Sequence, residues 1–358
     1  MSLPDAPIEP TRQAVPPADG TVRRGSRPWL IALPLALVLL AAVGWTGAWY
    51  YASARATAEI DAWIAAEAGK GRNWSCHDRQ FGGFPFRFEL ICTEPSLGFA
   101  GPGAWTVSAV RAHAVAQVWN PGHIIAEFQG PARLAETATG RELTANWSLL
   151  QVSGVGTRGE LERISWSAND YTLAESGTTV FSARHGEVHV RRTPDAAPGT
   201  FDIAAGARGA TGVATGVAGA GVDGEFEATV SGVPEFHPMP LPQRLQLWQQ
   251  AGGRVKLLEA SVSGGGGALG ATGEIGLDAA RRPDGALTLS LAKAPALMKA
   301  LADAGLMPEF LVNLAPAMTA VGMPGMLNGA PANTFPFLFR DGRVVLGVLP
   351  LGKIGPVY

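Results

Sequence analysis

One segment of the chain carries no charged side chain, from Pro28 to Ala54. Its apolar core, Trp29–Tyr51, is 23 residues long. As a helix it would extend about 34 Å, which exceeds the roughly 30 Å hydrocarbon core of a bilayer. Aromatic side chains bound the core at both ends, as is typical of transmembrane helices. The sequence therefore predicts a membrane anchor over residues 28–51.

Basic residues gather before this segment, at Arg23, Arg24 and Arg27. The positive-inside rule then places residues 1–27 in the cytosol, as a disordered tail, and the main domain in the periplasm of a bacterium. A signal peptide cleaved after Ala54 is the alternative, because Ala52-Ser53-Ala54 fits a small-x-small cleavage site. The apolar core is longer than the 7–15 residues of a signal peptide, which favours an uncleaved single-pass anchor in the inner membrane.

Composition excludes several classes of protein. The chain has 28 Lys+Arg and 30 Asp+Glu, a formal net charge of −2, which argues against a nucleic-acid partner. An apolar fraction of 47% is too high for a disordered chain. Two cysteines exclude both a four-cysteine zinc site and a disulfide-dense scaffold.

The residues after the anchor indicate a stalk and then a disulfide. Residues 52–72 carry Ile60, Trp63 and Ile64 at helical spacing, which predicts a stalk helix. Cys76 and Cys92 flank a predicted hairpin outside the cytosol, so we expect them to form a structural disulfide. A loop of this size contributes about 3 kcal/mol in the chain-entropy model.

Strand patterns dominate residues 73–358, with a change of character near residue 240. Phe84, Phe86, Phe88 and Leu90 alternate with Pro85, Arg87, Glu89 and Ile91, which predicts a strand with one apolar face. Similar runs recur at short intervals without intervening helices. Helices are expected at 241–251, 294–304 and 308–321, and a hairpin at Asp341-Gly342, while residues 204–221 fit no pattern. The predicted fold is mainly β: one long curved antiparallel sheet with a few C-terminal helices packed on it.

Two motifs in this pattern carry a resemblance to a known family. The Gly83-Phe84-Pro85-Phe86-Arg87 element and the C-terminal hairpin at 341–347, behind a short N-terminal anchor, resemble the bacterial domain of unknown function 2125. Residues 253–304 also resemble a module near the ends of AsmA-type envelope proteins. The first resemblance implies no established activity. The second implies a role in envelope maintenance, with lipid-carrying relatives.

The sequence shows no catalytic motif of the hydrolase, metalloprotease or calcium-loop type. We therefore expect no enzyme activity, no cofactor and no metal. The leading hypothesis is a periplasmic, membrane-anchored protein that handles phospholipid or maintains the envelope. The side chains expected to line its apolar groove are Phe84, Phe86, Phe88, Phe310, Leu314 and Met318. The alternative is an anchored scaffold with a closed core that binds a protein partner.

Overall fold

The computed structural model describes residues 29–100, 104–137, 139–157, 160–212, 221–234, 239–316 and 322–358. The chain divides into two compact units, Met1–Ala48 and Trp49–Tyr358. The predicted cytosolic tail, residues 1–27, lies outside the described residues.

A single helix, α1 (Trp29–Gly69), covers the predicted anchor from Trp29 onward and the predicted stalk, 52–72, as far as Gly69. Within the described part of the chain, α1 is the one helix long and apolar enough to cross a membrane. That property is consistent with a single-pass anchor. The helix ends at Gly69, and Gly71 follows with a φ of 77°, a left-handed conformation that glycine adopts without strain.

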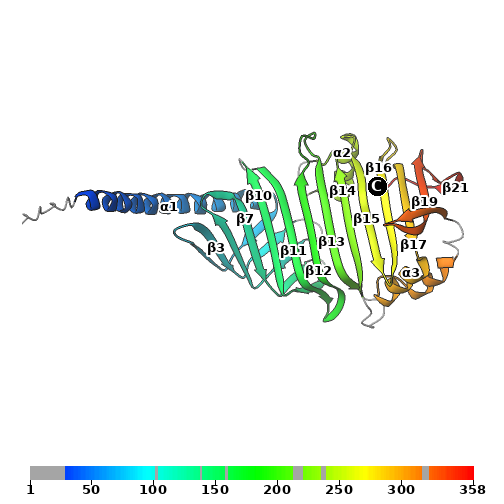
Figure 1. The fold of residues 1–358 in the computed structure, drawn as a ribbon, viewed down its shortest axis with the longest axis horizontal. Helices are drawn as coiled ribbons and strands as arrows, with labels where there is room; N and C mark the ends of the chain where they lie inside the picture. The colour runs from blue at the N-terminus through cyan, green and yellow to red at the C-terminus, as the bar shows by residue number, and fades with distance from the viewer. Residues whose placement is uncertain are drawn as a thin grey trace, which may run out of the picture. The chain divides into compact units, whose positions relative to one another are not determined.

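The second unit is built on a large antiparallel sheet (Figure 1), as the alternating patterns predict. Its main part runs in spatial order through strands that pair edge to edge. These are β2 (Asp78–Gly82), β3 (Arg87–Thr93), β6 (Arg111–Gln117), β7 (Asn120–Gln129), β10 (Leu149–Thr157), β11 (Glu160–Glu175), β12 (Thr178–Arg192), β13 (Phe201–Gly212), β14 (Val222–Val230), β15 (Arg254–Gly264), β16 (Gly267–Leu277), β17 (Pro283–Ala292) and β19 (Ala330–Arg340). From β10 to β17 each strand pairs with its neighbour in sequence.

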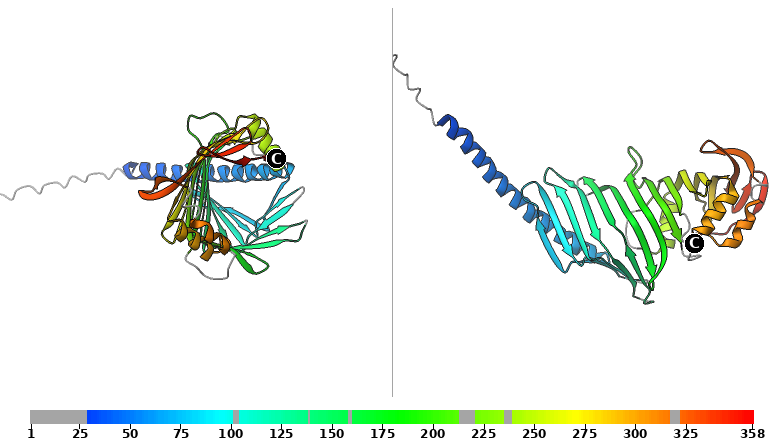
Figure 2. Two further views of the ribbon diagram at one scale, coloured as in Figure 1. Left: turned by 90° about the vertical axis from the view of Figure 1, so that its right-hand side faces the viewer. Right: turned by 60° about the horizontal axis from the view of Figure 1, so that its bottom comes forward.

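The long strand β11 is where the sheet divides. One edge of β11 pairs with β10 over Glu160–Asn169 and then with β9 over Thr172–Glu175. Strand β9 leads into a second layer, which we call the branch. The branch consists of β1 (Arg72–Ser75), β4 (Ser96–Phe99), β5 (Trp105–Ser108), β8 (Ala132–Glu136) and β9 (Glu142–Asn146). Seen from the side of the C-terminal strands, the strands of this unit bend around an inner face (Figure 2).

The C-terminal region adds short elements around β19. They are α2 (Leu241–Gln250), α3 (Ala294–Asp303), the 3₁₀ turn η1 (Glu309–Leu314), β18 (Met323–Leu327), β20 (Arg343–Leu346) and β21 (Leu349–Lys353). Strands β19 and β20 form the predicted hairpin at Asp341-Gly342, and both turn residues have positive φ, as a type I′ turn requires.

Two local expectations differ from the structure. The strand expected from Phe84 begins at Arg87, because the chain turns at Phe84–Phe86 beside α1. In the helix expected at 308–321, Glu309–Leu314 form a six-residue 3₁₀ turn, Ala315 and Pro316 are helical, and residues 317–321 lie outside the described part. Pro308 lies directly before the turn, where a missing backbone N–H costs no helical hydrogen bond.

The best-buried core lies at the C-terminal end of the inner face. Helix α3 buries Leu297 and Met298 against Leu291 and Phe335 of the sheet. Leu297 is 1% exposed, so this contact is complete. Towards the C-terminal end of the helix, Ala300 and Ala304 pack with Ala183, Ala210 and Val222. Helix α3 therefore packs on the sheet, as expected, and closes one end of its inner face.

Candidate functional site: the apolar face of the sheet

The inner face of the main sheet carries a continuous row of apolar side chains that crosses twelve strands. Each residue of this row is the register partner of the next. The row, which we call the central row, is Leu90, Ala114, Ala126, Val152, Trp166, Val188, Ala205, Phe226, Ala260, Ala271, Leu289 and Phe335. At about 4.8 Å between neighbouring strands, the row extends for roughly 50 Å.

A second row lies two residues from the central row, later in the chain on one strand and earlier on the next because neighbouring strands are antiparallel. It contains apolar residues and glycine until its last position. Because side chains alternate across a strand, it points to the same face as the central row. It consists of Cys92, Ala112, Phe128, Leu150, Ala168, Gly186, Ala207, Gly224, Val262, Leu269, Leu291 and Asn333.

The row between these two points to the opposite, outer face and is polar. After Ile91 it reads His113, Glu127, Gln151, Ser167, Glu187, Gly206, Glu225, Ser261, Gly270, Ser290 and Thr334. Its neighbours interact across strands, for example through a 2.6 Å hydrogen bond from the Gln151 amide to Glu127. The sheet is therefore amphipathic over its whole width, as a sheet is when one face meets water and the other meets apolar groups.

The middle of the inner face is hollow. An open cavity of about 590 Å³ lies over β11–β16. Its lining includes Trp166, Val188, Phe226 and Leu269, with small residues such as Ala205 between them. Because these residues have small side chains, the surface of the sheet is recessed between the large side chains, which form the walls of the cavity.

A second cavity, of about 380 Å³, lies between the main sheet and the branch. The branch contributes Trp74, Leu97 and Leu134, and the main sheet contributes Phe128 and Val152.

Both cavities are lined by Trp166 and Tyr171, so they adjoin at β11. Burial among these apolar groups raises the pKa of the Tyr171 hydroxyl, because the charged form is poorly solvated there. We call these two neighbouring cavities the apolar groove; α3 packs at the C-terminal end of the same face.

The structure places the groove residues expected from the sequence in three different settings. Phe88 shares the face of Leu90, packs on Trp49 and lies beside Phe81. Phe84 and Phe86 lie in the turn before β3, outside the groove lining.

The other three belong to the C-terminal segment. Phe310 is 70% exposed on η1, and Leu314 is the last residue of that turn. Met318 lies outside the described residues. The lining of the two cavities is instead supplied mainly by β11–β16 and the branch. The alternation in those strands is visible in the sequence, but their pairing register is not.

The Gly83–Arg87 motif packs on α1. The Trp49 side chain is 5% exposed, and its ring contacts Phe84 and Phe88 at centroid distances of 5.5 and 6.1 Å. A Cβ at Gly83 would lie 2.6 Å from the backbone oxygen of Arg87, so the tight turn requires glycine. The motif thus joins the helix to the first strands of the inner face.

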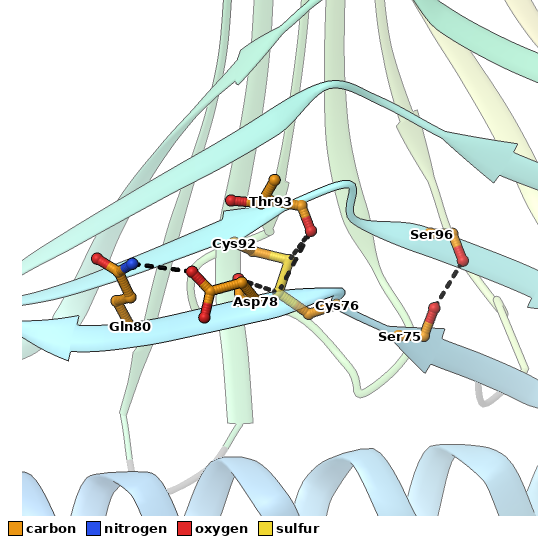
Figure 3. Close-up of a disulfide and its surroundings, with 7 residues drawn as sticks. All are labelled: Ser75, Cys76, Asp78, Gln80, Cys92, Thr93 and Ser96. Carbon is orange, nitrogen blue, oxygen red and sulfur yellow. Dashed lines mark hydrogen bonds between the residues drawn. A yellow bond between two sulfur atoms is a disulfide. The ribbon is translucent and has the colours of Figure 1, made fainter.

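Cys76 and Cys92 form the predicted disulfide, with Cα atoms 5.6 Å apart (Figure 3). The bond joins the segment before β2 to the end of β3. Nearby, the hydroxyl groups of Ser75 and Ser96 are 2.8 Å apart, which links β1 of the branch to β4. The covalent bond therefore fixes the point where the branch leaves the hairpin β2–β3.

The outer face carries one histidine cluster. His189 lies 3.2 Å from a carboxylate oxygen of Glu187, and His185 lies 3.7 Å from the same oxygen. Hydrogen bonding to His189 lowers the pKa of Glu187. In the described part of the chain, no group of three His, Cys, Asp or Glu residues could hold a metal ion.

Fold and site define a class of protein: an antiparallel sheet with one apolar face, preceded by a helix able to span a membrane. The chain belongs to the family described as "Uncharacterized protein conserved in bacteria (DUF2125)", whose model matches residues 49–355. The match begins at Trp49, the first residue of the second unit. No curated protein and no solved structure matches the chain. The resemblance of residues 253–304 to AsmA-type proteins is not shown by these comparisons.

Proposed function

We propose that the protein binds lipid acyl chains along the apolar face of its sheet and serves the handling of phospholipid in the bacterial envelope. The observation that carries this proposal is the central row, which is apolar at all twelve positions and whose middle part, from Trp166 to Ala271, lines an open groove. A closed soluble domain would be expected to fill such a face with its own side chains. Among the described residues, α3 fills the C-terminal end of the face, and the branch lies over the part that lines the second cavity.

The dimensions of the groove suit an acyl chain. From β11 to β16 the sheet is about 24 Å wide at 4.8 Å per strand step. One leaflet of a bilayer core is about 15 Å thick, so a lipid tail fits across this part of the groove. Transfer of the tail from water would contribute about 0.8 kcal/mol for each buried CH₂ group.

The lipid would be held by its tail, without chemistry performed on it. We therefore propose a non-enzymatic role that needs neither cofactor nor metal. The proposal also assigns α1 as an uncleaved inner-membrane anchor, with the N-terminus in the cytosol and residues 52–358 in the periplasm. The arginines before the apolar segment support this orientation through the positive-inside rule. A reporter fused to Tyr358 should be active in the periplasm, and activity in the cytosol would overturn the orientation.

Lipid mass spectrometry tests the binding function. Residues 49–358 would be produced in the periplasm and purified without detergent. We expect phospholipid to co-purify in stoichiometric amount. Folded protein without lipid would favour the alternative, an anchored scaffold that binds an envelope protein.

A further inference from the structure

We propose that two hairpin ends of the sheet, Gly82–Phe86 and Gln117–Asn120, insert into the interface of the membrane that holds α1. Together with Tyr50 they present an exposed group of rings, Tyr50, Phe84, Phe86 and Trp119, which we call the aromatic patch. The proposal rests on α1 being a membrane anchor. It does not depend on what the groove binds.

Contacts with α1 determine how deep the first hairpin end lies relative to the membrane. Trp49 packs on Phe84, and Tyr50 stacks on the same ring at 6.2 Å with an interplanar angle of 19°. Tyr50 belongs to the last turn of the uncharged apolar segment. By chain continuity, Phe84 therefore lies at the level where the helix leaves the hydrocarbon core.

The second hairpin end is tied to the first. The backbone N–H of Val118 donates a 3.1 Å hydrogen bond to the backbone oxygen of Phe86. The Phe86 and Trp119 rings are 6.5 Å apart, and the two residues are 60% and 65% exposed. Two large aromatic side chains are thus held side by side in solvent-accessible positions.

The chemistry around these rings suits a bilayer interface. Residues 81–86 and 117–122 contain no Asp, Glu, Lys or Arg, so insertion would bury no charge there. Arg87 follows directly; its side chain is mostly exposed and pairs with Glu89 at 2.6 Å, so this charge lies at the rim of the uncharged segment with its partner in place. Tyr and Trp side chains, here Tyr50 and Trp119, concentrate at this depth because their rings are apolar and their tips polar, and the two phenylalanine rings add apolar surface. An exposed aromatic group beside a membrane helix is therefore best explained by the bilayer surface.

Insertion would have a consequence for the sheet. Phe88, which packs on Trp49, lies two residues before Leu90, the first residue of the central row. The aromatic patch would hold this end of the apolar face against the outer surface of the inner membrane. Lipid could then pass between the bilayer and the sheet without crossing open water.

Site-directed spin labelling of the full chain in phosphatidylcholine–phosphatidylglycerol vesicles tests the proposal. Single labels would replace Trp119 (Trp119→Cys) and, separately, Phe86 (Phe86→Cys). The native cysteines are paired and do not react. Collision rates with oxygen, which enters the bilayer, and with a water-soluble nickel chelate report the depth of each label. Leu258→Cys, an exposed position on β15, is the aqueous control, and Leu39→Cys in the apolar segment is the membrane control.

We expect the labels at 119 and 86 to collide more often with oxygen than with the chelate, with a ratio between those of the two controls. Labels at both positions that behave like the one at 258 would overturn the proposal while leaving the anchor and the groove intact. A label at 39 that behaves like the one at 258 would overturn the anchor, and the patch with it. Lipid binding to residues 49–358 is measured separately, so a failure of the proposed function is distinguishable.

Discussion

The indole N–H of Trp49 donates a hydrogen bond to the backbone oxygen of Arg87 at 3.1 Å. This bond joins α1 to the first long strand of the inner face, across 38 positions of sequence. Trp49 is also the first residue of the family match. Both residues of this contact, which we call the Trp49 junction, therefore lie within the region that the family model matches.

Substitution of Trp49 should loosen this junction. Trp49→Phe removes the hydrogen bond and should lower the free energy of unfolding of residues 49–358 by about 1 kcal/mol. Trp49→Ala also empties a buried site and should cost about 3–5 kcal/mol. Denaturant titration measures both. Tyr50→Phe, at an exposed neighbouring position, is the control and should change stability by less than about 0.5 kcal/mol. Equal, small effects at both positions would show that the junction does not contribute to stability.

Gly224 offers a way to fill the groove without disturbing the strand. It lies on the floor of the larger cavity, and an added Cβ would lie 3.6 Å from its nearest neighbour, an ordinary contact. Gly224→Val should therefore keep the fold, since valine suits strands better than glycine, and reduce co-purifying lipid several-fold. The matched control is Thr272→Val on the outer face, which should leave lipid unchanged. Undiminished lipid in the folded Gly224→Val protein would argue against binding at this position.

Glu67 ties the end of α1 to β1. It is 6% exposed, and its carboxylate accepts a 2.6 Å hydrogen bond from Arg72 and one of 3.2 Å from Lys70. Hydrogen bonding to Arg72 lowers the pKa of Glu67 below its ordinary value of 4.5. Glu67→Gln should reduce stability at pH 7 by about 1–2 kcal/mol.

The pH dependence of that difference follows from the sign of the shift. A lowered carboxyl pKa stabilises the fold above the unfolded value and loses this effect as the pH falls through the folded value. The gap in stability between the native protein and Glu67→Gln should therefore be constant near neutrality and narrow below about pH 4.5. Parallel urea titrations at pH 7 and pH 4 measure it. A gap that widens at low pH would contradict the assigned ion pair.

Removal of the disulfide should destabilise the start of the sheet. The Cys76→Ser, Cys92→Ser double variant should lose about 3 kcal/mol of stability, the loop-closure contribution of a bridge of this length. Thermal unfolding under oxidising conditions measures the loss. The same experiment in reductant provides the control, because there the native protein and the variant should coincide. Peptide mapping that finds two free thiols in periplasmic material would disprove the bond.

The elements predicted well from sequence are those whose signals are local. The uncharged run at 28–54, the Asp341-Gly342 turn and the cysteine pair each depend on residues close together in the chain. Alternation likewise predicted a long antiparallel sheet. The division of β11 between β10 and β9 was not predictable, because it is set by register between distant strands.

The site was harder to predict for the same reason. The phenylalanines of the Gly83–Arg87 motif looked like a strand face, but two of them lie in a turn that packs on Trp49. The small residues of the groove floor, such as Ala205 and Gly224, give no signal by themselves. They can be recognised as part of a site only when the pairing register of the strands is known, because the register places them side by side in rows across the sheet.

The groove itself is tested most directly by photo-crosslinking at two adjacent residues of β12. Val188 points into the groove and is 38% exposed, whereas His189 points to the outer face with a side chain that is 45% exposed. A benzophenone amino acid would replace each in turn in the full chain, in membranes that contain radiolabelled phospholipid. Lipid binding along the apolar face predicts labelled adducts at 188 and few at 189. Equal labelling at both positions, or none at 188, would contradict it.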